Sequence, residues 1–155
     1  MADSTGILLW QATNRWLRQV QAVLAPHGLT YVQFLLLAAI ADRPDANEAP
    51  TQVDLARRLR ADVMMTSQVL RALERRRLVV RDLDPRDARA RQVRLTAAGA
   101  RLVERVSAIV GAAEDAYFAA LGVERNAFAG ALGRLIGIRV RLRVPVGGGI
   151  IASGE

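Results

Sequence analysis

The segment RDLDPRDARARQVRLT, residues 81–96, concentrates basic side chains around a turn. It carries arginine at positions 81, 86, 89, 91 and 94, and its centre, Asp84-Pro85-Arg86-Asp87, is rich in residues that favour turns. The stretches on either side, 78–83 and 90–95, alternate in polarity as strands do, which predicts a hairpin. A guanidinium is a planar fork of donors that matches phosphate oxygens and base edges. The chemistry that this segment offers is therefore the binding of an anionic partner.

A second group of residues, LARRLRADVMMTSQVLRAL at 55–73, has the spacing of two short helices joined by a tight turn. Small Ala56 would let the two helices cross closely, as in a helix-turn-helix. Hydroxyl, amide and guanidinium groups on the second helix would suit base edges and phosphates. An ordinary solvated helix face is the alternative, and the adjoining hairpin favours the binding interpretation. The expected outward stripe comprises Met64, Ser67, Gln68, Arg71 and Arg75.

The rest of the chain predicts further helices around these two. Apolar residues recur at helical spacing over 7–24, and the segment 31–41 is apolar nearly all round, which places it at the centre of the fold. A long helix should follow the hairpin, another should start near Val123 and stop near Arg139, and 141–155 should be an extended or poorly ordered tail. The predicted order is four helices, a hairpin and two helices. Expected helix caps are Thr30, Thr51, Asp62 and Thr96.

Composition narrows the possible functions. The 155 residues carry a formal net charge of +7, and every one of the 22 basic residues is arginine, which favours an anionic partner such as nucleic acid. There is no cysteine, one histidine and no cluster of carboxylates, so we expect no metal, no cofactor and no enzymatic activity. The N-terminus lacks the features of a secretory signal, and the most apolar window is too short to span a bilayer. We therefore expect a cytoplasmic protein with no membrane partner.

A helix-turn-helix followed directly by a hairpin is a winged helix, and the chain resembles the MarR family of bacterial winged-helix regulators. The resemblance covers about 4–135 and rests on GLTYVQFLLLAAI, TQVDLARRLRADVMMTSQVLRALERRRLVVR and DLDPRDARARQVRLTAAG. It is most specific in the hairpin, where the family shows D-x-R-D-x-R followed by V-x-L-T-x-x-G. The matching residues are Asp84, Arg86, Asp87, Arg89, Val93, Leu95, Thr96 and Gly99.

The resemblance implies a mainly α fold with a small β-hairpin wing, which binds double-stranded DNA at a pseudo-palindromic operator as a homodimer. Residues 30–95 would form the DNA-binding lobe, and 1–29 with 96–140 the helical dimerisation region. Asp84 and Asp87 would support the wing, with Arg86 entering the minor groove. The expected DNA contacts are Thr66, Ser67, Gln68, Arg71, Arg75, Arg86 and Arg89.

Two further expectations concern packing. The apolar stripes Leu9–Leu24 and Leu102–Leu121 both require cover, which predicts an obligate dimer. A charge at Val106 or Ile109 should dissociate or unfold it if either side chain lies in the interface. The family often has glycine at the position of Arg77, directly after the second helix of the motif. An arginine held there in the left-handed conformation would cost about 1 kcal/mol, unless the chain leaves the helix differently.

The resemblance also implies a small-molecule site, because family members often bind small aromatic or phenolic anions. Trp16, His27 and Tyr31 would line such a pocket, and Arg15 and Arg18 would supply the counter-charge. Core packing is the alternative role for these aromatic residues. Two other functions stay open at this point: a winged helix that binds another protein, and an architectural protein that binds DNA without sequence preference. Repressor and activator are not distinguished.

Overall fold

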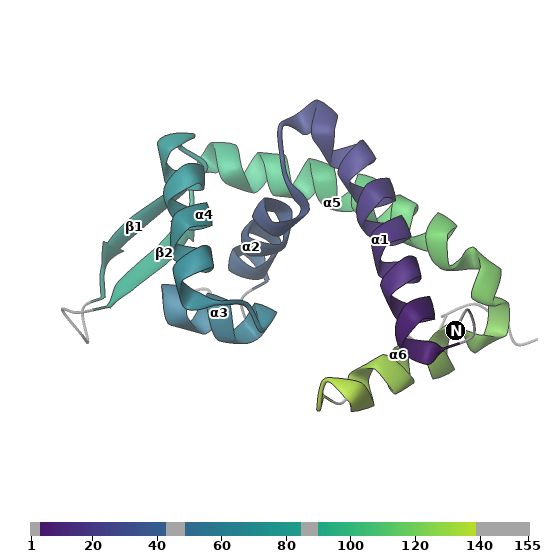
Figure 1. Cartoon of the computed structure of the whole chain (residues 1–155). Coiled ribbons are helices and arrows are strands. Elements are labelled where there is room, and N and C mark those ends of the chain that lie inside the picture. Colours follow the sequence, from purple (N-terminus) through teal and green to yellow (C-terminus); the bar gives the residue numbers. More distant parts are fainter. Residues whose placement is uncertain (1–3, 43–48, 85–89, 139–155) are drawn as a thin grey trace, which may run out of the picture. The chain divides into compact units, whose positions relative to one another are not determined.

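The computed structural model describes residues 4–42, 49–84 and 90–138. The predicted order of four helices, a hairpin and two helices is confirmed, with two short 3-10 helices in addition (Figure 1). The chain divides into two compact units, one up to Ala116 and one from Tyr117. The elements are α1 (Thr5–Leu24), η1 (Ala25–His27), α2 (Tyr31–Ala41), α3 (Gln52–Leu59), α4 (Val63–Arg75), β1 (Val79–Leu83), β2 (Arg91–Leu95), α5 (Ala97–Phe118), η2 (Ala119–Glu124) and α6 (Arg125–Leu135).

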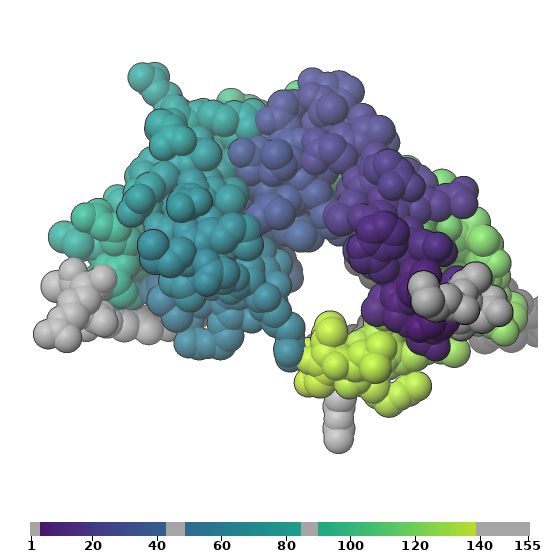
Figure 2. Space-filling model, in the orientation of Figure 1, coloured from purple at the N-terminus to yellow at the C-terminus, as the bar shows by residue number. Residues whose placement is uncertain are grey.

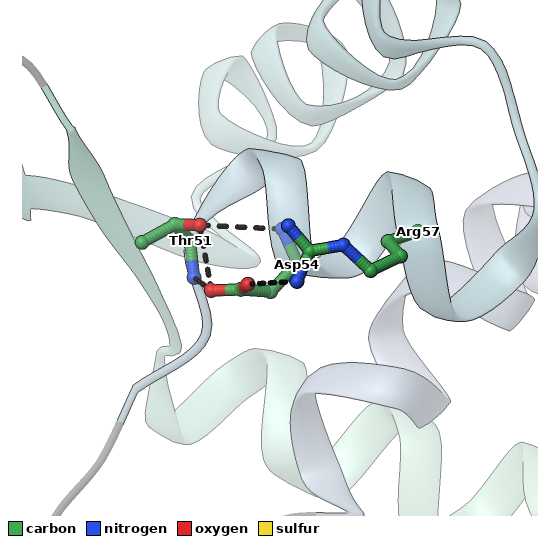
Figure 3. Close-up of polar contacts among 3 residues, drawn as sticks. All are labelled: Thr51, Asp54 and Arg57. Atoms are coloured by element: carbon green, nitrogen blue, oxygen red, sulfur yellow. Dashed lines mark hydrogen bonds and ion pairs between the residues drawn. The ribbon is translucent and has the colours of Figure 1, made fainter.

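Polar caps fix where four of the helices begin, as the sequence predicts. Thr30 and Thr51 each form a complete capping box, with Gln33 and Asp54 as the respective partners. At the start of α3, the Thr51 backbone N–H donates to Asp54 at 3.0 Å and its hydroxyl donates at 2.7 Å (Figure 3). These bonds, from the hydroxyl first and then the backbone, lower the pKa of Asp54, and nearby Arg57 lowers it further. The cap is therefore at full strength at neutral pH and weakens only as the pH falls through that lowered pKa.

The core of the first unit is built around α2, whose residues are buried on nearly every side as expected. Val20 and Leu24 of α1 belong to the same buried cluster as Leu102 and Val106 of α5. Part of each apolar stripe, on α1 and on α5, is therefore covered within one chain. The Val106 side chain is fully buried in this core, so it is not accessible to a second copy and a charge there would act on the fold of one chain. Ile109 is only partly buried.

The hairpin pairs β1 with β2 in antiparallel register, from Val79 opposite Leu95 to Leu83 opposite Arg91. Both strands lie within one residue of the predicted bounds. A short bridge from Thr51 to Gln92 adds the segment before α3 to the outer side of β2, and the Val93 N–H donates to the Pro50 carbonyl at 2.8 Å. This attachment joins the hairpin to the helix-turn-helix at two places in the chain, before α3 and after α4.

The carbonyl group of Leu78, just after α4, is the point where α4, the hairpin and α5 meet. It accepts a hydrogen bond from the Thr96 backbone N–H at 3.1 Å, and the Thr96 hydroxyl lies 3.2 Å from it while donating to the Arg77 carbonyl at 2.7 Å. The same hydroxyl accepts from the Gly99 N–H at 3.0 Å and so caps α5. A Cβ at Gly99 would lie 2.0 Å from the Leu78 oxygen. Thr96 and Gly99 are thus required by one backbone junction.

The second unit has its own small aromatic cluster. The Phe118 ring contacts Tyr117 edge-on and lies 6.2 Å from the Phe128 ring, with the Arg125 guanidinium above it. The last helix, α6, ends at Leu135 rather than near Arg139, because Gly137 takes a left-handed conformation at φ 69° that ends the helix. The predicted tail, 141–155, lies outside the described residues.

We predict that Gly99→Ala lowers the free energy of unfolding by about 3 kcal/mol, since the added methyl group meets a carbonyl oxygen that is already fixed by hydrogen bonds. Gly111→Ala, in the middle of the same helix with no atom near its Cβ position, should instead raise it by up to about 1 kcal/mol. Urea unfolding of the two variants measures both effects. Equal effects from the two substitutions would show that the close contact between Gly99 and Leu78 does not determine the stability.

Candidate nucleic-acid interface

A tight corner joins α3 to α4 and sets the direction in which α4 leaves. Arg60 takes a left-handed conformation at φ 51°, and the Ala61 N–H donates to the Ala56 carbonyl at 2.9 Å. Ala56 is buried between the two helices, as its small size predicted. The Asp62 carboxylate then accepts from the Met65 N–H at 2.8 Å and caps α4. The predicted helix-turn-helix is present, with both of its helices capped.

The outer face of α4 carries the side chains that are free to meet a partner. Gln68, Arg71 and Arg75 are exposed, and Met64 is 70% exposed. Within the described part of the chain, none of these four makes a side-chain hydrogen bond or ion pair. Figure 2 shows the teal surface over α4 uncovered on this side of the unit. The face offers an amide, two guanidinium groups and a thioether.

Two residues expected to contact DNA lie on the inner side of this helix. Ser67 was placed in the outward stripe, and that prediction is wrong because its side chain is only 8% exposed. Thr66 is 1% exposed, and its hydroxyl donates to the Asp62 carbonyl at 2.8 Å. Both side chains are short and face the interior beside Leu70 and Leu73. They support the helix and leave the outer face to the longer side chains.

The arginines of the hairpin have different environments. Arg81 turns back to α4, where its guanidinium donates twice to the Glu74 carboxylate at 2.6 and 2.9 Å, so its charge is neutralised locally. Arg91 and Arg94 are exposed on β2. The Asp84 N–H donates to the Ala90 carbonyl at 3.0 Å and closes the hairpin. The described residues do not include Arg86, Asp87 and Arg89, so their roles stay predictions.

Two consecutive arginines, Arg76 and Arg77, follow the last residue of α4. Arg76 reaches the turn before α2, where its guanidinium donates to the Gly28 carbonyl at 2.7 Å and lies 3.4 Å from the Gln33 side-chain oxygen. Arg77 takes a left-handed conformation at φ 56°, which is what the family's glycine at this position would suggest. The chain therefore leaves α4 through a left-handed residue, and the arginine side chain makes that backbone conformation strained.

An open groove runs between α1 and the start of α2. Of the five residues expected to bind a small molecule, Arg18 and Tyr31 line this groove. Trp16 packs edge-on against the Tyr31 ring at 5.9 Å, beside the core, whereas Arg15 and His27 do not line the groove. The expected role of Arg15 and His27 therefore stays a prediction that this groove does not support. The groove is lined by Asn14, Leu17, Arg18, Gln21, Ala22, Ala25, Thr30, Tyr31 and Val32.

Gln21 is a polar residue of this groove that the sequence did not single out. Its side chain donates to the Leu29 carbonyl at 3.0 Å and accepts from the Tyr31 N–H at 3.2 Å, so it closes the turn between α1 and α2. Its spacing of three from Arg18 on a helix could have indicated a shared face. Burial raises the pKa of the Tyr31 hydroxyl; a hydrogen bond with Trp16 opposes the shift and the Glu114 carboxylate adds to it. The phenol is accordingly neutral at physiological pH.

The described residues contain no group of three His, Asp or Glu side chains that could hold a metal ion. What they do contain is a helix-turn-helix whose second helix presents an exposed polar and basic face, followed by a hairpin attached through β2 and Thr96. These features define a winged helix-turn-helix protein. In this class the second helix of the motif enters the major groove of DNA.

Comparison with known proteins agrees with this class. A profile of the MarR family matches residues 27–90. The transcriptional regulator YdcH of Bacillus subtilis is 38% identical over 127 residues, which are 82% of this chain and 86% of that protein. The S. aureus MepR–DNA complex has a TM-score of 0.77 at 25% identity, covering 86% of this chain and 97% of that one. Bordetella bronchiseptica BpsR, whose DNA binding is regulated by 6-hydroxynicotinic acid, has a TM-score of 0.78 at 26% identity, covering 88% and 95%.

The chain belongs to the MarR family of helix-turn-helix regulators. It is a DNA-binding transcriptional regulator and not an enzyme. The resemblance to the MarR family and the fold class expected from it are thereby confirmed.

We predict that Arg77→Gly raises the free energy of unfolding by about 1 kcal/mol, because glycine adopts the left-handed conformation without a Cβ clash. Arg71→Gly removes the same side chain from the right-handed interior of α4 and should lower it by about 1 kcal/mol. Chemical denaturation of both variants gives the sign of each change in the free energy of unfolding. Destabilisation by both changes would mean that the Arg77 side chain contributes more than its backbone conformation costs.

Proposed function

We propose that the protein is a sequence-specific repressor that binds a pseudo-palindromic operator as a homodimer and is released by a small aromatic anion. The observation that carries the proposal is the exposed face of α4, where Gln68, Arg71 and Arg75 make no side-chain hydrogen bond or ion pair within the described residues. An amide can pair with the edge of adenine, and a guanidinium with guanine or a phosphate. The hairpin beside α4 adds Arg91 and Arg94 on β2. We place this activity in the cytoplasm, with no membrane partner.

Exposed apolar residues support a homodimer. In the first unit they gather near the start of α1, where Trp10 is 68% exposed next to Leu8 and Leu9. In the second unit Val123, Leu135 and Ile136 are exposed. The helical run 97–135 is long and apolar enough to cross a bilayer by length and composition alone, but it is broken at Gly122. Its most apolar window is only 17% buried in this chain, and we infer that a second copy covers much of the remainder.

DNA binding is tested by titrating the protein with a duplex from its own promoter against random duplex. Gln68→Ala should relax the preference at one base pair per half-site, at a cost of about 1–3 kcal/mol for the preferred base.

Arg86→Ala should make the slope of log affinity against log salt concentration shallower by roughly one unit. Asp84→Ala should cause a smaller loss of affinity than Arg86→Ala, by freeing Arg86. Arg105→Ala removes the same charge from an exposed site on α5 and serves as the control.

The outcomes separate the competing functions. A repressor gives two chains per operator and a clear preference over random duplex. Equal affinity for both duplexes would identify an architectural DNA-binding protein, and no salt-dependent DNA binding at all would leave a protein-interaction module. A tighter complex with Asp84→Ala would contradict a positioning role for that carboxylate.

The groove between α1 and α2 is the proposed effector site, with Arg18 as the counter-charge. It combines apolar walls with Arg18, Gln21 and the neutral phenol of Tyr31. The proposal is supported by BpsR, a relative of similar fold that responds to an aromatic acid. The turn beside the groove is also the one that Arg76 connects to the end of α4. A ligand in the groove would therefore act close to the support of the DNA-contacting helix.

We predict that 6-hydroxynicotinate or 4-hydroxybenzoate releases the operator complex. Arg18→Gln should raise the concentration needed by about tenfold, because one charge-assisted hydrogen bond to the carboxylate is lost. Arg15→Gln, on the same helix but outside the groove, should leave it unchanged. Competition measured by fluorescence anisotropy of labelled operator gives both values. Equal behaviour of the two variants would remove the groove from consideration.

A further inference from the structure

Three consecutive apolar residues, Val63, Met64 and Met65, occupy the first turn of α4 and are all exposed. Single exposed apolar residues are common on protein surfaces and need no explanation. Here, however, the three follow directly on the Asp62 cap, at the end of the helix whose N-terminal residues reach base edges in helix-turn-helix proteins. Met64 is the most exposed of them, at 70%.

Helical geometry places Met64 on the same face as the polar residues of the interface. Gln68 and Arg71 follow it by four and seven positions, which brings all three side chains onto one stripe of α4. Met65 is offset by one position and is aligned instead with Val69, which is partly buried. A duplex that contacts Gln68 and Arg71 through the major groove must therefore meet the Met64 side chain, and not that of Met65, near the base edges.

The chemistry of a thioether restricts what Met64 can recognise there. Methionine has no hydrogen-bond donor and no charge, so it cannot pair with a phosphate, and its sulfur is only a weak acceptor for the donors on base edges. The apolar group that the major groove presents is the 5-methyl group of thymine. A flexible and polarisable methionine side chain can pack closely against such a methyl group.

We propose that Met64 determines part of the operator preference by packing against the 5-methyl group of a thymine in each half-site. This inference rests on the proposed operator binding and adds a specificity-determining residue to it. It predicts that one position of each half-site is selected for its methyl group and not for a hydrogen bond. A 5-methylcytosine at that position carries the same group and would share the contact.

The test uses duplexes that the wild-type protein enriches from a random library. Thymines in one half-site are replaced singly by deoxyuridine, which removes the methyl group and keeps every hydrogen-bonding atom. One such replacement should weaken wild-type binding about three- to fivefold, the effect expected for burying one methyl group. Met64→Ala should bind the thymine and uracil duplexes equally. A cytosine to 5-methylcytosine change at the same position should restore part of the affinity with the wild type only.

Two variants control for the identity of the side chain. Met65→Ala changes the same residue type on the neighbouring position and should keep the discrimination between thymine and uracil. Met64→Leu should also keep it, since leucine remains apolar, and it covers the case in which Met64→Ala fails to fold. The proposal is overturned if no single uracil weakens wild-type binding, or if Met64→Ala discriminates as well as the wild type. Failure to enrich any sequence at all would instead contradict the proposed operator binding.

Discussion

The backbone junction at Leu78 is the constraint on which the winged lobe depends. Its carbonyl accepts from the Thr96 N–H, and the Thr96 hydroxyl bridges the Arg77 carbonyl and the Gly99 N–H. One threonine thus joins the exit of α4, the start of β1 and the first turn of α5. The close approach of Gly99 leaves no room for a side chain at that point. The direction of the hairpin relative to α4 follows from this contact, together with the left-handed exit at Arg77.

Local signals in the sequence were sufficient for the framework. The caps at Thr30, Thr51 and Asp62 were predicted from spacing because each involves residues only three positions apart. The hairpin bounds followed from alternating polarity on both sides of a turn. The left-handed backbone at Arg77 was anticipated from a departure in a family pattern, and no local property of arginine would have indicated it. The caps and the hairpin depend on neighbours along the chain, which is why the sequence reveals them.

Contacts between distant elements could not be predicted in the same way. Ser67 was expected to face outward, but α4 packs with its serine and threonine inward, and the periodicity of a short helix leaves its orientation uncertain by one position. Arg81 was grouped with the other arginines of the hairpin because nothing in its own segment identifies Glu74 as its partner. The apolar stripe of α5 was assigned to a dimer interface, whereas part of it packs against α1 and α2 of the same chain. In each case the deciding partner lies on another element.

The exposed face of α4 has one more consequence, which concerns divergence between related regulators. Within the described residues, Gln68, Arg71 and Arg75 make no side-chain hydrogen bond or ion pair, whereas the caps, the Leu78 junction and the buried face of α4 hold the lobe together. If this face reads the operator as we propose, target preference and folding are encoded by separate residues. After a gene duplication, a copy can acquire a new target through a few substitutions on this face, without first gaining compensating changes in the core. Regulatory connections can consequently change much faster than the fold that carries them.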